Sequence, residues 1–309
     1  PCSDPTSEYL AGSACAQFLN ASAPVIIDSM KVLEKEGFPK SWEIIKPAIK
    51  KLFYKGNIDL LTGEFPRLAI VGSRRMTDYG ARVIEKWMPE LVRAGVVIVS
   101  GFMYGVDQKA HRECVECGGK TVAVLGWGID WQVPNSDMEI YEKIIETNGL
   151  IVSEYEGKKM GELWTFPARD RVMAGVCDAV LVVEAAEKSG SLVTARFARN
   201  FGVKVLAVPG QVTSKVAEGT NGLIKRGEAI LVSSASDILQ EMSLGLGQMQ
   251  LLLDSHSLDP ILSLLSDEPK TVDELSRILK MNMMELLSKL TEMSLMGEVE
   301  ERNGKYWKV

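Results

Sequence analysis

Short apolar runs alternate with segments of helical periodicity across the middle of this chain, and this alternation constrains the fold more than any other feature. The runs are rich in Val, Ile and Leu, as are strands buried on both faces of a parallel sheet. They predict an α/β fold, an extended Rossmann-like and mostly parallel sheet with helices on both faces. The predicted strands are 67–72, 96–100, 121–125, 150–153, 179–184, 203–208 and 229–232, and the predicted helices are 79–94, 106–116, 138–146 and 192–201, with a kink or break at Pro89.

The two ends of the chain differ from this middle part. Residues 1–64 carry short stretches of helical apolar spacing, which predict an N-terminal helical segment. Residues 65–240 make up the predicted sheet domain, and the composition of 241–257 is typical of a linker. Residues 258–309 predict three short amphipathic helices and then a hairpin with an Asn-Gly turn, which is the order of a winged helix-turn-helix domain.

Charge and cysteine content narrow the class of protein. The 309-residue chain has a formal net charge of −6, whereas dedicated duplex-DNA binders are usually basic, so a nucleic-acid site has to be a local patch. The five cysteines are an odd number and do not form a disulfide framework, so we expect a cytoplasmic protein. No apolar run is long enough to cross a membrane, and no membrane association is expected.

Arginines and small hydroxyl residues flank one of the predicted strands. The run from Phe166 to Arg171 places two arginines beside a predicted Phe-Pro turn, and Ser189-Gly190-Ser191 follows the strand 179–184 at a predicted helix start. Guanidinium groups and helix N-termini both bind anions, most often phosphate. Gly72-Ser73-Arg74-Arg75 follows the first predicted strand. Because the carboxyl ends of parallel strands meet at one edge of a sheet, we expect a phosphate-binding pocket there.

Two partial signatures of catalysis or metal binding lie in the predicted helix 106–116. Asp107 and His111 share one helix face, as a carboxylate-oriented general base requires, but a structural role is favoured. Cys114 and Cys117 form a CxxC pattern without a partner cluster or a thioredoxin context, which favours thiols packed in a helix over a zinc or redox site.

Three acidic residues near strand ends leave a further alternative open. Glu154, Asp178 and Glu184 are candidates for paired acids in hydrolysis, although helix capping or salt bridges are favoured. The chain has no phosphate-binding P-loop, no complete dinucleotide fingerprint and no nucleophile elbow. We therefore predict no catalytic residue, no metal and no cofactor.

Taken in order, the motifs of the sheet domain resemble the DNA-processing protein A family (DprA, also called Smf), over roughly residues 53–238. The resemblance implies a non-enzymatic protein that binds single-stranded DNA, forms a homodimer and loads the RecA recombinase in natural transformation and recombination. The C-terminal winged helix resembles the module at the end of many members. By motif position, the residues implied to contact the nucleic acid are Gly72, Ser73, Arg74, Arg75, Gly101, Phe166, Arg169, Arg171, Ser189, Gly190 and Ser191.

The chain departs from the family pattern at several positions. Asp170 stands between the two arginines where asparagine is common, and the bulky Met103 stands where a small residue is expected. The winged helix is acidic, with seven Lys/Arg against ten Asp/Glu over 258–309, which disfavours duplex binding by that module. The alternatives are a phosphoribohydrolase-like enzyme, whose catalytic acid is missing after Gly219-Thr220, and a winged-helix transcriptional regulator.

Overall fold

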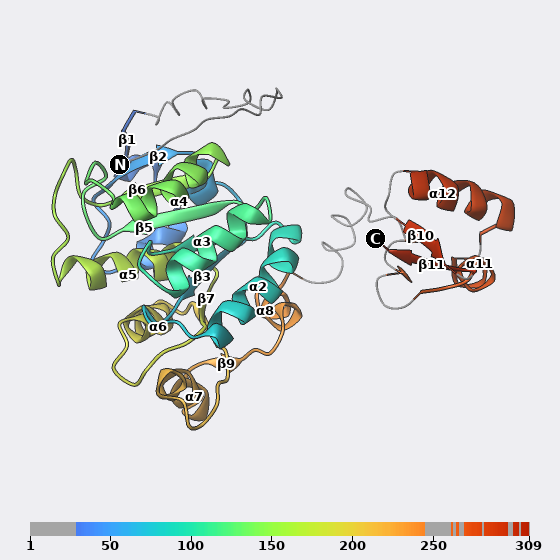
Figure 1. The fold of residues 1–309 in the computed structure, drawn as a ribbon. Coiled ribbons are helices and arrows are strands. Elements are labelled where there is room, and N and C mark those ends of the chain that lie inside the picture. The colour runs from blue at the N-terminus through green and yellow to red at the C-terminus, as the bar shows by residue number, and fades with distance from the viewer. Residues whose placement is uncertain are drawn as a thin grey trace, which may run out of the picture.

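Nine strands form one continuous sheet in the described part of the chain before residue 245 (Figure 1). The computed structural model describes residues 29–244 and, towards the C-terminus, 261, 264–265, 269–279, 281–295, 299–302 and 304–308. The strand order is β1-β2-β6-β5-β4-β3-β7-β8-β9. The strands are β1 (Lys31–Glu34), β2 (Lys51–Gly56), β3 (Arg67–Val71), β4 (Val97–Ser100), β5 (Thr121–Leu125), β6 (Leu150–Ser153), β7 (Ala179–Val182), β8 (Lys204–Ala207) and β9 (Ile230–Leu231).

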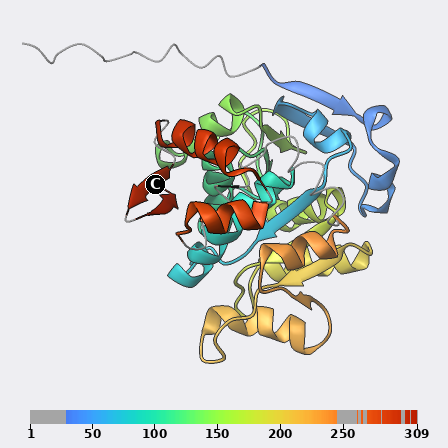
Figure 2. The ribbon, with the colours of Figure 1, turned by 90° about the vertical axis from the view of Figure 1, so that its right-hand side faces the viewer.

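The strands from β3 onward pair in parallel, whereas β1 and β2 extend the sheet antiparallel to their neighbours. The blue β1 and β2 lie at one end of the sheet, and the yellow to orange segments that contain β8 and β9 lie at the other, as two views at right angles agree (Figure 1, Figure 2). Apart from the short edge strand β9, which is exposed, the parallel strands are almost entirely buried, which fits their near-continuous apolar sequences.

Helices cover both faces of this sheet. Alternate side chains of β3 point to opposite faces. Leu68 and Ile70 pack in an apolar cluster with the helices at Asp78–Arg93 (α2), Val106–Glu116 (α3) and Ala235–Glu241 (α8). Ala69 and Val71 pack in a second cluster with the helices at Thr165–Val176 (α5), Ser191–Asn200 (α6) and Glu218–Lys225 (α7). In the described residues no helix is long and apolar enough to span a bilayer. The helices are α1 (Asp59–Thr62), α2 (Asp78–Arg93), α3 (Val106–Glu116), α4 (Asn135–Glu146), α5 (Thr165–Val176), α6 (Ser191–Asn200), α7 (Glu218–Lys225) and α8 (Ala235–Glu241), with short 3₁₀ helices at Lys35–Gly37, Lys40–Ile44 and Lys215–Ala217.

The strand order reverses direction at β3, and this reversal positions the site. β3 pairs with β4 on one side and with β7 on the other, in the register Leu68–Ala179 and Val71–Val182. The chain leaves β3 towards α2 on one face and leaves β7 towards α6 on the other face. The two loops diverge at this point, and in parallel sheets such a reversal creates the crevice where ligands bind.

The predicted α/β fold with a mostly parallel sheet is confirmed, but three local predictions are wrong. The N-terminal segment is not wholly helical, because β1 and β2 belong to the main sheet; residues 1–28 lie outside the described part. Helix α2 continues through Pro89, so the predicted break is wrong, while the alternative of a kink stays a prediction. The predicted Phe-Pro turn is instead the first turn of α5, where proline's missing N–H costs no intrahelical bond.

The C-terminal module has the order predicted for a winged helix. Helices α11 (Val272–Leu279) and α12 (Met283–Leu295) precede a hairpin of β10 (Val299–Arg302) and β11 (Lys305–Lys308). Gly304 in the turn has a φ of 75°, which glycine adopts without strain. The module has an apolar core of its own, which includes Leu275, Leu286 and Leu290. Most of the predicted linker and part of the predicted helix at 260–265 lie outside the described residues.

Candidate functional site

An open pocket of about 700 Å³ lies where β3 and β7 end. Its lining comes from the loops after β3, β4 and β7 and from helices α5 and α6. The pocket therefore occupies the crevice expected at the reversal of strand order. Nine of the eleven predicted site residues line it: Gly72, Ser73, Arg74, Arg75, Phe166, Arg169, Ser189, Gly190 and Ser191.

Three exposed cationic side chains line this pocket, namely Arg74, Arg75 and Lys188. The backbone N–H of Arg75 donates to Ser73 Oγ at 3.0 Å, which holds the turn that carries both arginines. The Arg74 guanidinium lies 5.6 Å from the centroid of the Phe166 ring, within cation–π range. Sequence reasoning missed Lys188, although its place in the loop between β7 and α6 was a usable signal.

Helix α6 directs its N-terminal end at the same pocket. Ser189, Gly190 and Ser191 all line the pocket, and α6 begins at Ser191, as the sequence predicts. The hydroxyl oxygens of Ser189 and Ser191 are 2.8 Å apart and share a hydrogen bond. The backbone N–H groups of Ser191 and Leu192 donate to Ser189, and that of Val193 donates to Gly190. The start of α6 therefore acts mainly through the partial positive charge of a helix N-terminus, which adds to the attraction that the nearby cations exert on an anion.

Arg169 forms the floor of the pocket and is itself buried, with its side chain 4% exposed. Its Nη1 donates to the carbonyl oxygen of Val124 at 3.0 Å, and its Nε lies 3.1 Å from Asp170 Oδ1. Gly101 lies beneath it, because a Cβ at that position would overlap the guanidinium. Gly101 is therefore not part of the lining; it leaves the space that Arg169 occupies.

Two buried carboxylates offset the charge of Arg169. Burial raises the pKa of Asp107 to about 6, although Arg169 acts in the opposite direction. Burial also raises the pKa of Asp170, against the attraction of Arg169 and Arg74. The ion pair at 3.1 Å orients Arg169 and offsets part of its charge, so the positive field of the pocket depends mainly on the exposed cations and on the start of α6.

Arg171 does not line the pocket, contrary to the prediction. Its Nη2 donates to Glu154 Oε1 at 2.7 Å, just beyond the end of β6, and both side chains are largely buried. Successive residues of a helix point in different directions, so Arg169 and Arg171 on α5 reach different surroundings. Arg171 therefore links α5 to the loop that follows β6.

Models of two protein families match this chain. The model of DNA recombination-mediator protein A matches residues 29–243, and the model of the DprA winged helix domain matches residues 254–305. The chain belongs to the DNA recombination-mediator protein A family. The matched residues include the whole nine-stranded sheet and every residue of the pocket.

Curated relatives of this family match most of the sheet domain. The chain is 42% identical over 190 residues to the DNA processing protein DprA of Streptococcus pneumoniae strain R6, covering 62% of this chain and 66% of that protein. It is 33% identical over 266 residues to the protein Smf of Escherichia coli K12, covering 82% of this chain and 70% of that protein. The match to the Smf protein of Synechocystis spans only 48% of its length.

Solved structures of family members share the fold. The X-ray structure of DprA from Streptococcus pneumoniae superposes with a TM-score of 0.64 at 38% identity, covering 70% of this chain and 75% of that one. DNA processing protein A from Helicobacter pylori, whose structure was described for its single-stranded DNA binding mode, superposes with a TM-score of 0.62 at 30% identity. That match covers 74% of this chain and 97% of the other.

Three acidic residues near strand ends, Glu154, Asp178 and Glu184, each form a hydrogen bond or an ion pair within the protein. Both carboxylate oxygens of Glu184 accept hydrogen bonds from Thr77, at the start of α2. Asp178 Oδ2 accepts from the backbone N–H of Arg67 at 2.8 Å. Glu154 is paired to Arg171, so the favoured salt-bridge or capping role fits Glu154 and Glu184, whereas Asp178 instead binds the backbone of β3.

His111 is held as a neutral core residue in the structure. Its Nδ1 lies 2.7 Å from Thr121 Oγ1, whose own hydroxyl donates to the Ile98 carbonyl, so Nδ1 is the donor. Burial lowers the pKa of His111 to about 3, and the Arg169 charge acts in the same direction. No hydrogen bond joins it to Asp107 among the described residues, so the two do not form a carboxylate-oriented base.

The CxxC pattern lies in and just after α3, without a metal site. Cys114 is buried, its Sγ donates to the carbonyl oxygen of Lys120 at 3.4 Å, and burial raises the pKa of its thiol. Cys117 is also a free thiol. Within the described ranges, no group of three or more His, Cys, Asp or Glu side chains is placed to hold a metal ion.

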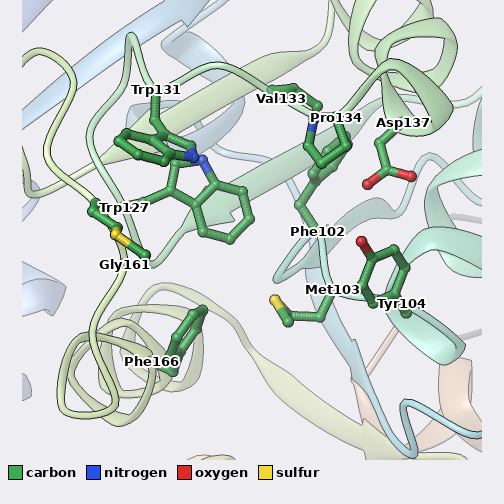
Figure 3. A pocket seen from close by; sticks show the side chains of 11 residues that line it. Phe102, Met103, Tyr104, Trp127, Trp131, Val133, Pro134, Asp137, Gly161 and Phe166 are labelled. Atoms are coloured by element: carbon green, nitrogen blue, oxygen red, sulfur yellow. The ribbon is translucent and has the colours of Figure 1, made fainter.

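A second, smaller pocket of about 230 Å³ adjoins the first and shares Met103 and Phe166 with it (Figure 3). It is lined mainly by aromatic and apolar side chains, including Phe102, Trp127 and Trp131. Sequence reasoning placed only Phe166 at a site, because aromatic residues in loops give no periodic signal. We call the two cavities the arginine pocket and the aromatic pocket.

Proposed function

We propose that this chain binds single-stranded DNA by its backbone phosphates in the arginine pocket. The observation that carries the proposal is the convergence of Arg74, Arg75 and Lys188 with the N-terminus of α6 on one open cavity. These groups recognise phosphate without reading sequence. The Helicobacter pylori relative, described for its single-stranded DNA binding mode, supports the same ligand class.

The proposal includes the wider role of a recombination mediator. The protein acts without catalysis as a homodimer that loads the RecA recombinase onto the bound strand in the cytoplasm, during natural transformation and recombination. Family membership supports this role. The test is the rate of RecA filament assembly on single-stranded DNA with and without the protein, together with the mass of the protein in solution. An unchanged assembly rate would argue against the loading function.

The DNA-binding proposal is tested by fluorescence anisotropy with single-stranded and duplex oligonucleotides over a range of salt concentrations. We expect a clear preference for the single strand. Replacing Arg74, Arg75 or Lys188 with Ala is expected to weaken binding. Each replacement should also reduce the log-log salt slope by about one unit for each phosphate that the protein no longer neutralises.

A matched control removes one exposed cation outside the pocket. Lys225→Ala, at the end of α7, changes the net charge equally and should leave the salt slope unchanged. Unaltered binding in the triple variant of Arg74, Arg75 and Lys188 would refute the pocket assignment. Tighter, sequence-selective duplex binding would instead support a winged-helix regulator.

A further inference from the structure

The aromatic side chains of the aromatic pocket come from three separate segments. Phe102 and Tyr104 come from the loop after β4, Trp127 and Trp131 from the loop after β5, and Phe166 from α5 (Figure 3). Drug-sized ligands occupy cavities of about 300–1,000 Å³, so a cavity of about 230 Å³ suits a smaller body such as one planar ring system. Aromatic walls stack on such rings.

The aromatic pocket adjoins the proposed phosphate site. Phe166 lines both pockets, with the Arg74 guanidinium over its ring and the Trp127 ring centroid 6.3 Å away. Met103 lines both as well. In a nucleotide only one sugar separates the phosphate from the base, so a strand with a phosphate beside Arg74 has a base within reach of the aromatic pocket.

One buried carboxylate interrupts the apolar lining. Asp137 is 7% exposed, and within the described residues its carboxylate accepts one hydrogen bond, from Ser136 Oγ at 3.1 Å. Figure 3 shows this carboxylate on the opposite side of the cavity from the two tryptophans. A buried carboxylate has room for several donors and is unfavourable without them. Trp127, another lining residue, keeps its indole N–H buried and without a partner in the described part of the chain.

A purely structural role, in which Asp137 only stabilises the start of α4, does not explain why its carboxylate lines the aromatic pocket. An acid in the first turn of α4 favours the helix electrostatically. However, the only hydrogen bond to its carboxylate within the described residues comes from the Ser136 side chain and not from a backbone N–H of the helix start. The helix start by itself also gives no reason for a carboxylate to line an otherwise aromatic cavity.

We propose that the aromatic pocket takes up a single nucleobase from the strand held in the arginine pocket, and that Asp137 makes guanine the preferred base. The inference rests on the proposed function, which supplies the strand. The Watson–Crick edge of guanine presents an N1–H and an N2 amino group side by side, which matches the two acceptor oxygens of a carboxylate.

The other bases match this carboxylate less well. Adenine and cytosine present one amino group beside an acceptor nitrogen, so they give Asp137 a single donor. Thymine presents one N–H between two carbonyl oxygens, which repel a carboxylate. Hypoxanthine keeps the N1–H of guanine but lacks the N2 amino group, so its predicted affinity lies between those of guanine and thymine.

The test uses the full chain and five oligonucleotides of equal length. One contains only thymine, and in each of the others every fourth thymine is replaced by guanine, adenine, cytosine or hypoxanthine. By anisotropy at fixed salt we expect the guanine strand to bind about fivefold or more tightly than the thymine strand, with hypoxanthine between them. Equal affinity for all five strands would overturn the proposed base preference.

Replacing Asp137 tests whether this residue causes the preference for guanine. Asp137→Asn should bring the guanine and thymine strands to within about twofold of each other, while binding to the thymine strand persists. The control Asp78→Asn removes the same charge from the exposed first turn of α2, outside both pockets, and should keep the preference. A preference that survives Asp137→Asn would overturn the role of Asp137.

The outcomes separate this inference from the proposed function. Tight, salt-dependent binding without a base preference leaves the arginine pocket assigned and rejects base selection. Failure of every strand to bind rejects both. If Asp137→Asn does not fold, as judged by circular dichroism, the series of five strands with the unaltered protein still decides the base preference.

Discussion

The guanidinium of Arg169 occupies the volume that a side chain at Gly101 would need. A buried arginine requires hydrogen-bond partners and space, and here Val124 and Asp170 supply the partners while Gly101 supplies the space. The strand-end glycine and the arginine of α5 are 68 residues apart in sequence, yet they form one structural unit beneath the arginine pocket.

Gly101→Ala is therefore expected to destabilise the protein. The added methyl group overlaps the Arg169 guanidinium and must displace it, at a cost of roughly 1–3 kcal/mol for overpacking and more if the Arg169 charge loses its partners. Urea unfolding measures the change. Gly190→Ala is the matched control, since its Cβ meets no atom within 4 Å and its backbone is helical; equal losses in both variants would contradict this account.

Arg171→Ala should affect stability far more than it affects DNA binding. It leaves Glu154 largely buried without its partner, and breaking a buried pair costs about 3–5 kcal/mol. Thermal unfolding is the measurement. Lys143→Ala, which removes an exposed pair with Glu139, should leave the unfolding temperature almost unchanged. An Arg171→Ala variant that is fully stable but binds DNA poorly would instead place this residue at the DNA site.

Asp107 should make the stability of the protein depend on pH. Its pKa is about 6 in the folded state against 3.8 for the free side chain, so the folded state holds a proton that the unfolded state releases between these values. The contribution to stability is thus present below about pH 4 and is lost as pH rises through 6, by an amount on the order of 3 kcal/mol.

Asp107→Asn isolates this contribution, because all other titrating groups remain. The free energy of unfolding of the original protein, relative to that of the variant, is expected to fall between pH 4 and pH 6.5. Denaturant unfolding at several pH values gives this difference. A constant difference over the range would show that Asp107 titrates normally.

Phe166→Ala should weaken binding of single-stranded DNA by about 1–3 kcal/mol, the value typical of removing one aromatic ring on which a base stacks. The ring contributes to both pockets and lies under the Arg74 guanidinium. Phe65→Ala removes an exposed ring that lines neither pocket and serves as the control for general effects. Equal binding by the two variants in anisotropy titrations would argue against a stacking role for Phe166.

The sequence predicted the parallel sheet well because its strands are buried on both faces. The run 121–125 coincides with β5, and the segment 106–116 coincides with α3, where amphipathic periodicity is clear. Such continuous apolar runs and helical stripes are direct consequences of burial. The winged-helix module was predictable for the same reason, through its short amphipathic helices and its Asn-Gly turn.

Helix α5 escaped prediction for two physical reasons. Pro167 suggests a turn, but proline is tolerated in a first helical turn. The helix is also buried on almost every side from Arg169 to Val176, so it shows no alternation of polar and apolar faces.

Residue type alone could not tell which arginines reach the pocket. Arg169 and Arg171 look equally suited to phosphate, yet Arg169 donates to the Val124 carbonyl of β5 and Arg171 donates to Glu154, just beyond β6. The exposed cations of the site follow β3 and β7 directly, where side chains project from loops. The pairing of Arg171 with Glu154 depends on the tertiary contact between α5 and the end of β6, which no local pattern records.

The pairing of β3 with β7 also governs when the site can form during protein synthesis. β3 is made about 110 residues before its parallel neighbour β7, a delay of roughly 5–20 s at typical ribosome speeds. Until then one edge of β3 has no partner, and neither the Ser189 loop nor the start of α6 exists. The nascent chain must therefore keep an apolar strand edge from aggregating for seconds, and the arginine pocket is among the last features of the sheet to assemble.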